Sequence, residues 1–309
     1  MAAVETVLEA ARAAGRPSLV TYVTAGVRAD WGALLTAMID AGADAVEIGL
    51  PFSDPMLDGP VIQQASAQAI ARGASTRAIL TELRGIDTRG VPLIAMAYAN
   101  HAYAGGLDRY CRALAAAGFA GVIIPDIPAG EAADYLSAAT AAGLDATLMI
   151  APATPPDQLE AIAARTRGFL YVMGVMNTTG TTTPNSDAPT WALADRARSL
   201  SARPAVIGFG IDTPARAGAA VRHADGVIVA SALMRQVLAG ETPAQVGAAV
   251  ANLRAAVDTA RAEVDTARAK MDTARAEAAP ARGEMDTARA DAGAAWAEAN
   301  TARGDGTPD

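Results

Sequence analysis

The chain has 309 residues, of which 51% are hydrophobic, and its formal net charge is −8. This excess of acids argues against nucleic acid as the main partner, because a phosphate backbone is bound by clustered cations, and the single cysteine, Cys111, excludes an intrachain disulfide. The N-terminal segment lacks the apolar core of a signal peptide, and no apolar run is long enough to cross a bilayer, so we expect a soluble cytoplasmic protein with no membrane partner.

Short apolar runs alternate with alanine-rich helical stretches along most of the chain. The eight candidate strands are residues 19–23, 45–49, 93–97, 121–124, 146–150, 169–173, 205–208 and 226–229. Continuous apolar runs are typical of parallel strands that are buried on both faces. Eight strand–helix units in residues 1–250 predict an α/β fold, a TIM (β/α)8 barrel with an N-terminal helix. An open doubly wound sheet is the alternative, although the stretch TYVTAGVRAD after the first run lacks a glycine-rich nucleotide-binding fingerprint.

The C-terminal segment, residues 251–309, differs from the rest in composition and repeats every seven residues. The repeats read VDTARAE, VDTARAK, MDTARAE, AAPARGE and MDTARAD. Their first and fourth positions form an a/d seam in which the fourth residue is always alanine. Because alanine buries little area, and because Pro280 and Gly283 interrupt the pattern, we expect a frayed helix or disorder. A coiled-coil partner helix is the alternative.

Glu47 lies inside the apolar run 45–49. If Val46 and Ile48 face the helices, Glu47 faces the interior of the barrel, near the C-terminal strand ends where TIM-barrel active sites lie. Burial there would raise its pKa and make it a general acid or base near neutral pH. The alternative is a structural acid paired with a buried arginine, but Arg28 is the only arginine in residues 18–71.

Two more acids, Asp54 and Asp58, lie in the loop PFSDPMLDGP that follows this run. Neighbouring proline and glycine residues also suit turn or helix-cap aspartates, so residue type alone leaves both roles open. A Schiff-base mechanism needs a buried lysine, and the only lysine is Lys270 in the tail. With two histidines in the chain, a His-rich metal site is also disfavoured. Acid–base chemistry must then rest on Asp, Glu or Tyr.

Glycine and serine residues follow the last strands, in GFG (208–210) and at Ala230 and Ser231. In TIM barrels the loops after strands 7 and 8 often bind phosphate through backbone N–H groups, which requires no lysine. Apolar and aromatic residues late in the strands would line the rest of a pocket, or else form the top layer of the core. They are Tyr22, Met96, Tyr98, Met149, Tyr171 and Phe209.

Several motifs follow one another in the order found in one enzyme family. They are EIGLPFSDPMLDGP (47–60), MAYAN (96–100), PDIP (125–128), Thr179-Gly180, GFG (208–210) and Ser231-Ala232. On these residues the chain resembles the alpha subunit of tryptophan synthase over roughly residues 1–245. The resemblance implies a TIM-barrel lyase that cleaves indole-3-glycerol phosphate by a retro-aldol reaction, with indole and glyceraldehyde 3-phosphate as products and no cofactor or metal.

The resemblance also implies roles for single residues. Glu47 would protonate indole C3 and assist deprotonation of the neighbouring hydroxyl, and Asp58 would hydrogen-bond the indole N–H. Thr179 would orient Asp58, and Tyr171 would line the site. Asp54 corresponds to a residue at the contact with the beta subunit. Backbone N–H groups and one hydroxyl would hold the phosphate, and they belong to Gly180, Gly210, Ala230 and Ser231.

The sequence departs from the family pattern in several places. Residues 174–180, GVMNTTG, replace a loop that usually carries a serine and an arginine, Ala230 stands where glycine is usual, and the heptad tail has no counterpart. Three functions stay open: an alpha subunit that works with a beta subunit, a stand-alone lyase that releases indole for specialised metabolism, and a catalytically weak binding or regulatory subunit. The altered loop favours the second, Asp54 favours the first, and intact Glu47 and Asp58 argue against the third.

Overall fold

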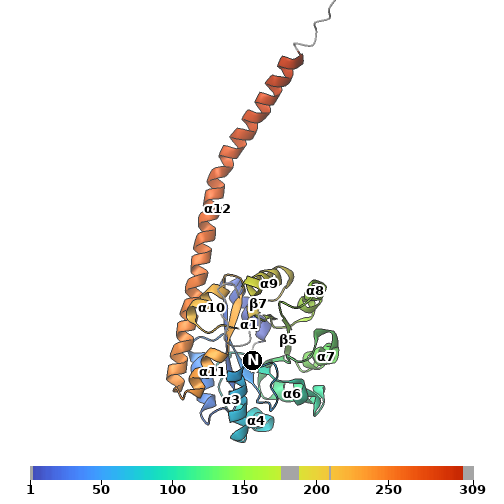
Figure 1. The fold of residues 1–309 in the computed structure, drawn as a ribbon, viewed down its shortest axis with the longest axis vertical. Coiled ribbons are helices and arrows are strands. Elements are labelled where there is room, and N and C mark those ends of the chain that lie inside the picture. Colours follow the sequence, from blue (N-terminus) through green and yellow to red (C-terminus); the bar gives the residue numbers. More distant parts are fainter. Residues whose placement is uncertain (1–2, 175–187, 209, 302–309) are drawn as a thin grey trace, which may run out of the picture. The chain divides into compact units, whose positions relative to one another are not determined.

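The computed structural model describes residues 3–174, 188–208 and 210–301 (Figure 1). Eight parallel strands close into a barrel in chain order, since β8 pairs with β1. The strands are β1 Ser18–Thr24, β2 Ala45–Gly49, β3 Leu93–Met96, β4 Phe119–Ile123, β5 Asp145–Ile150, β6 Leu170–Val172, β7 Ala205–Ile207 and β8 Gly226–Val229. The predicted TIM barrel is confirmed, and the open doubly wound sheet is excluded.

Helices surround the strands in Figure 1. They are α1 Val4–Ala13, α2 Trp31–Asp40, α3 Pro60–Ala71, α4 Thr76–Leu83, α5 Ala99–Tyr103, α6 Leu107–Ala116, the 3-10 turn η1 Ala129–Glu131, α7 Ala133–Ala141, α8 Pro156–Arg165, α9 Ala188–Leu200, α10 Pro214–Ala220, α11 Ser231–Leu238 and α12 Pro243–Thr301. Side-chain caps mark the N-termini of two helices. The Ser75 side chain accepts a hydrogen bond from the Ala78 N–H at the start of α4, and the Thr213 side chain accepts one from the Arg216 N–H at the start of α10. Proline in the first turn of α3 suits its fixed φ to a helix start.

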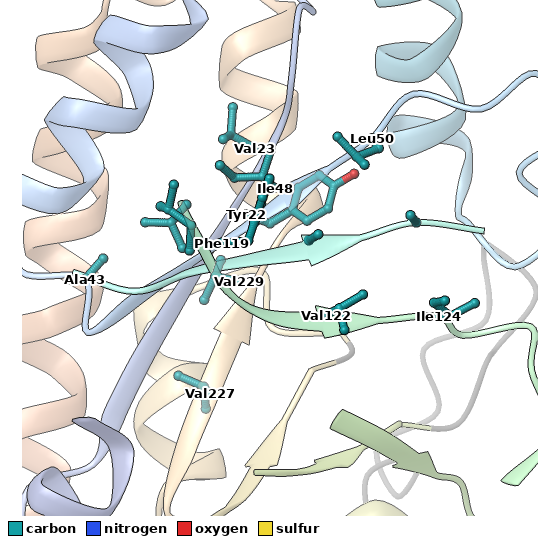
Figure 2. Close-up of a cluster of buried hydrophobic side chains, with 14 of the residues drawn as sticks. Tyr22, Val23, Ala43, Ile48, Leu50, Phe119, Val122, Ile124, Val227 and Val229 are labelled. Atoms are coloured by element: carbon teal, nitrogen blue, oxygen red, sulfur yellow. The ribbon is translucent and has the colours of Figure 1, made fainter. Parts of the chain in front are cut away.

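Along most strands, alternate residues enter two separate hydrophobic clusters, as the period of two in a strand predicts. The larger cluster lies between strands and helices and includes Val46 and Ile48. Figure 2 shows part of it, with Val23, Ile48 and Leu50 among the labelled side chains. The smaller cluster fills the barrel interior and includes Ala45. Glu47 shares the face of Ala45 and therefore points inward.

The N-terminal helix α1 closes the N-terminal end of the barrel. Its Val4 and Leu8 belong to the interior cluster. The backbone N–H of Glu5 donates to Asp145 Oδ2 at 2.9 Å, and Glu5 Oε1 lies 3.2 Å from Arg203 Nε. Apolar packing, a hydrogen bond to the Asp145 carboxylate and an ion pair thus fix this helix to β5 and to the segment before β7.

The chain divides into two units, Met1–Arg261 and Ala262–Asp309. Within the first unit, a seam of α12 is buried at Val246, Val250, Leu253, Val257 and Ala260. An ion-paired cluster accompanies this seam, because Asp44 accepts from the Nη1 atoms of Arg16 and Arg254 at 3.0 Å each. The sequence predicted the boundary at residue 250, whereas the first unit extends to Arg261.

In the second unit α12 continues to Thr301. Met271 and Trp296 are exposed there by 57% and 72%. Across the part of the chain that the structure describes, no helix has both the length and the apolar composition needed to cross a membrane.

Candidate active site

Glu47 lies in the middle of β2, with Tyr22 of β1 and Ile94 of β3 beside it in register. The side chain is only 2% exposed, and its Oε2 atom has no hydrogen-bond partner among the described residues. Burial, and then the charge of Asp58, raise the pKa of Glu47 to about 8. Glu47 therefore holds a proton near neutral pH and can donate it to a bound molecule.

Asp58 follows β2 in the loop that leads to α3. It is not the cap of that helix, because the cap position is Gly59 and α3 has no side-chain cap hydrogen bond. Its Oδ2 atom instead accepts a hydrogen bond from the Tyr98 hydroxyl at 3.1 Å. Burial raises the pKa of Asp58 to about 6, and the hydrogen bond from Tyr98 opposes this rise.

The two carboxyl groups thus titrate at different pH values. With a pKa of about 6 for Asp58 and about 8 for Glu47, the first is ionised and the second protonated between these values. The negative charge of Asp58 contributes to this separation, because it disfavours ionisation of Glu47. Pairs whose pKa values are pushed apart are typical of sites where one group is an acid and the other a charge stabiliser.

Tyr98 connects this pair to the loop before α3. Its hydroxyl donates to Asp58 and accepts from the Leu57 N–H at 3.0 Å. Its ring stacks on Phe52 with centroids 5.0 Å apart, and His101 contacts Phe52 edge-on at 5.3 Å. Phe52 and the Leu57 amide are site components that sequence reasoning missed, since only folding brings them to Tyr98.

The motif residue Asp126 fixes the segment that carries Tyr98. Its Oδ1 atom accepts a hydrogen bond from the Ala99 N–H at 2.8 Å. This bond joins the segment that follows β4 to the segment that follows β3. Ala99 begins α5, and Tyr98 occupies the cap position. The PDIP motif is thereby linked to the placement of the Tyr98 hydroxyl.

Two buried tyrosines, Tyr22 and Tyr171, interact with Glu47 and depend on glycines for space. A Cβ on Gly49 would overlap the Tyr22 hydroxyl, and a Cβ on Gly208 would overlap the Tyr171 ring. The Tyr171 hydroxyl donates to the Gly208 carbonyl at 2.7 Å. Burial, with added repulsion from Glu47 and Asp58, raises the pKa of both phenols well above the ordinary value. They are therefore neutral polar groups in the site.

Met96 and Met149 are half-buried and pack against the interior cluster. Met96 pairs in register with Gly49, and Met149 pairs with Tyr171. Their partial exposure, next to strand positions that carry Glu47 and Tyr171, places flexible apolar groups on the walls of the barrel mouth.

The predicted phosphate residues are described only in part. Gly210 follows β7 with φ +71°, a left-handed conformation that favours glycine. Ala230 occupies the cap position of α11, which begins at Ser231 directly after β8. Backbone N–H groups in the first turn of a helix have no partner within the helix and can bind anions. Thr179, Gly180 and Phe209 lie outside the described residues.

Asp54 is separate from these groups. It is exposed, and the Ser53 hydroxyl donates to its Oδ2 atom at 2.6 Å. Met56 in the same loop is 72% exposed. This part of the loop therefore faces outward, while Leu57 and Asp58 turn back toward Tyr98.

Comparisons with known proteins agree with this geometry. A family model described as tryptophan synthase alpha chain matches residues 8–264. The tryptophan synthase alpha chain of Salinispora arenicola is 39% identical over 240 residues, which cover 77% of this chain and 90% of that one. The corresponding protein of Roseiflexus sp. is 40% identical over 251 residues, 79% of this chain and 95% of that one.

Solved structures give the same result. A Mycobacterium tuberculosis tryptophan synthase chain superposes with a TM-score of 0.76 at 32% identity, covering 84% of this chain and 99% of that chain. A tryptophan synthase subunit alpha from Legionella pneumophila superposes with a TM-score of 0.75 at 30% identity, with coverage of 84% and 99%.

Proposed function

The chain belongs to the tryptophan synthase alpha chain family, and we propose that it cleaves indole-3-glycerol phosphate to indole and glyceraldehyde 3-phosphate. The enzyme is a carbon–carbon lyase of the aldolase type in tryptophan biosynthesis. The observation that carries the proposal is the buried carboxyl group of Glu47, with a pKa of about 8, beside the ionised Asp58. The relatives named above are all tryptophan synthase chains, which favours this role over a stand-alone lyase or a catalytically weak subunit.

Glu47 supplies the proton that the carbon–carbon cleavage needs. Its carboxyl group donates a proton to indole C3, which places positive charge on the ring nitrogen. The carboxylate that results accepts the proton of the side-chain hydroxyl while the bond from C3 breaks and the carbonyl of the aldehyde forms. Glu47 ends each turnover protonated, so atoms and charge balance without a further reactant.

Asp58 stabilises the charge that develops on the ring. As a carboxylate it accepts a hydrogen bond from the indole N–H, and this bond strengthens as the nitrogen becomes positive. We assign to Tyr98 the orientation of Asp58, since its hydroxyl already donates to the carboxylate. Thr179 is proposed as a second orienting group for Asp58.

Binding and catalysis use different parts of the barrel mouth in this proposal. Tyr22, Met96, Met149, Tyr171 and Phe209 contact the indole and the carbon chain, and the apolar walls exclude water from the reacting atoms. Backbone N–H groups and the serine hydroxyl hold the phosphate at Gly180, Gly210, Ala230 and Ser231. We include no metal or organic cofactor.

We further propose that a tryptophan synthase beta subunit is the protein partner. Asp54 lies on the exposed part of the loop whose other end carries Asp58, so a partner bound there would act directly on the position of a reacting group. The catalytic domain is assigned to the first unit, which ends at Arg261, and the rest of the tail is an appendage without catalytic residues. Cytoplasm is the proposed compartment.

Indole release by the purified chain tests the proposal. Indole-3-glycerol phosphate is supplied with and without a beta subunit from a relative, and indole is measured by chromatography. A rate that rises when the beta subunit is added supports the alpha-subunit role. An equally high rate without it supports the stand-alone lyase, and the absence of indole in both cases overturns both enzyme assignments.

A further inference from the structure

The N-terminal end of the barrel carries a cavity of about 430 Å³, a volume typical of small-molecule sites. It lies beside the residues that directly precede β1 and β8, whereas Glu47 lies in the middle of β2 and Asp58 follows the C-terminal end of that strand. Its charged lining comes from α1 and the turn after it, α9, the segment before β8, and α12. The charged residues are Arg12, Arg16, Arg198, Arg261, Asp195 and Asp225.

The charge of this cavity is opposite to that of the whole chain. Four arginines and two aspartates line it, although the chain as a whole has 33 acidic and 25 basic residues. A concave surface with an excess of one charge and low-dielectric walls raises the local concentration of counter-ions. The cavity therefore favours an anion.

Both aspartates of the cavity are already engaged by the protein. Asp225, 8% exposed, accepts from Arg198 Nε at 3.1 Å through one oxygen and from the Ala205 N–H at 2.9 Å through the other. Asp195 Oδ2 lies 2.9 Å from His223 Nδ1. Asp225 therefore offsets part of the charge of Arg198, as Asp44 does for Arg16 at 2.6 Å. What the cavity offers an anion is the guanidinium N–H groups that these pairs leave over.

Two arginines keep nitrogen atoms available for a ligand. Arg198 uses Nε for Asp225, and Arg12 uses Nη2 for the Ala202 carbonyl at 2.7 Å and for a 3.6 Å contact with Glu9. Their other terminal nitrogens make no hydrogen bond within the ranges that the structure describes. The side chain of Arg12 is 36% exposed and that of Arg198 is 34% exposed. Each guanidinium is thus anchored at one edge and accessible at another.

We propose that this cavity binds a small multivalent oxyanion, of the inorganic pyrophosphate or phosphate-ester class. Guanidinium groups donate paired N–H groups to phosphate oxygens, and anchored guanidiniums lose little further freedom on binding. The ligand bridges α1, α9 and the end of the first unit in α12. Binding therefore stabilises the fold at the end of the barrel remote from Glu47.

Thermal unfolding of the full chain with inorganic pyrophosphate tests this site. Sodium chloride at matched ionic strength corrects for general screening. A rise in Tm that grows with the logarithm of the pyrophosphate concentration is expected, about 5 °C when pyrophosphate reaches about a hundredfold excess over its Kd. Calorimetric titration at 25 °C measures the Kd itself on chains that are folded.

The variant Arg12→Gln/Arg261→Gln removes two charges from the cavity, and its Kd for pyrophosphate is expected to rise at least ~10-fold. The matched control is Arg77→Gln/Arg84→Gln, which removes two exposed charges, one in α4 and one at its C-cap, and should leave the Kd unchanged. If the double variant does not fold, the Kd is measured with Arg12→Gln alone. The Arg12 side chain is 36% exposed, so this single substitution should be tolerated.

Two results would overturn the site. One is a Tm that rises no more with pyrophosphate than with matched chloride. The other is an unchanged Kd in the cavity variant, which would assign the binding elsewhere, for example to the phosphate loops after β7 and β8. Pyrophosphate bound at those loops would also compete with the substrate and inhibit indole release. The cavity variant itself should release indole at the wild-type rate.

Discussion

The substitution Glu47→Gln keeps the size of a side chain that is 2% exposed and removes its titrating proton. General acid–base catalysis contributes about 10²–10⁴-fold to rates, so indole release should fall at least ~10²-fold. The pH profile gives a second expectation. Wild-type activity needs Asp58 ionised and Glu47 protonated, so it should fall below a pKa of about 6 and above a pKa of about 8. The residual activity of Glu47→Gln should no longer fall as the pH rises above about 8.

Folding stability gives a readout of the same group without substrate. The pKa of Glu47 is raised from its ordinary value of 4.5 to about 8 in the folded chain, because burial disfavours the charged form. The proton is therefore bound more tightly in the folded than in the unfolded chain. Its contribution to stability is fully present below pH 4.5 and is lost as the pH rises to about 8.

Each pKa unit corresponds to about 1.4 kcal/mol, so the loss is on the order of 5 kcal/mol. Glu47→Gln does not titrate and should unfold at a higher denaturant concentration than wild type at pH 8.5, with a smaller difference at pH 4.5. Urea unfolding at both pH values measures this. Undiminished indole release, or the same stability difference at both pH values, would refute the assignment of a buried, proton-holding Glu47.

Three further changes test other parts of the account. Tyr98→Phe removes the hydrogen bond that lowers the pKa of Asp58, so the acid limb of the indole-release profile should move to higher pH; a limb that stays in place contradicts the orienting role. Truncation after residue 261 should leave the Tm unchanged, whereas truncation after residue 250 removes buried Leu253 and Val257 and should lower the unfolding free energy by at least ~3 kcal/mol. Equal melting of the two truncations would contradict this packing. Asp54→Ala should leave the indole release of the isolated chain unchanged and weaken binding of a beta subunit in calorimetry, and an unchanged affinity would remove Asp54 from the interface.

The strands could be predicted from the sequence because each is a continuous apolar run buried on two faces. All eight runs form strands, with ends that differ by one or two residues, as at β4, which begins at Phe119 and not at Gly121. The register shift between β3 and β4 near Leu93 is one local reason, since an irregular pairing leaves no mark in hydropathy. The inward direction of Glu47 could be predicted because its two neighbours in the strand, Val46 and Ile48, face the helices.

Other features depend on contacts that the sequence does not encode locally. The hydrogen bond between Tyr98 and Asp58 joins residues 40 positions apart, and the pKa of Asp58 follows from that contact and from burial. The heptad pattern marks Val257 and Ala260 as part of a seam, and both are buried, but the pattern does not say which surface covers them. The cationic cavity is assembled from arginines that are 249 residues apart at the extremes, Arg12 and Arg261, and no motif connects them.

The most direct test of the central claim is to quantify indole and glyceraldehyde 3-phosphate together, from indole-3-glycerol phosphate, with the wild-type chain and with Glu47→Gln at pH 7. Equal amounts of the two products are expected from the wild-type chain, and at least ~10²-fold less of both from the variant. No cleavage by the wild-type chain, with or without a beta subunit, or equal product from both chains, would contradict it.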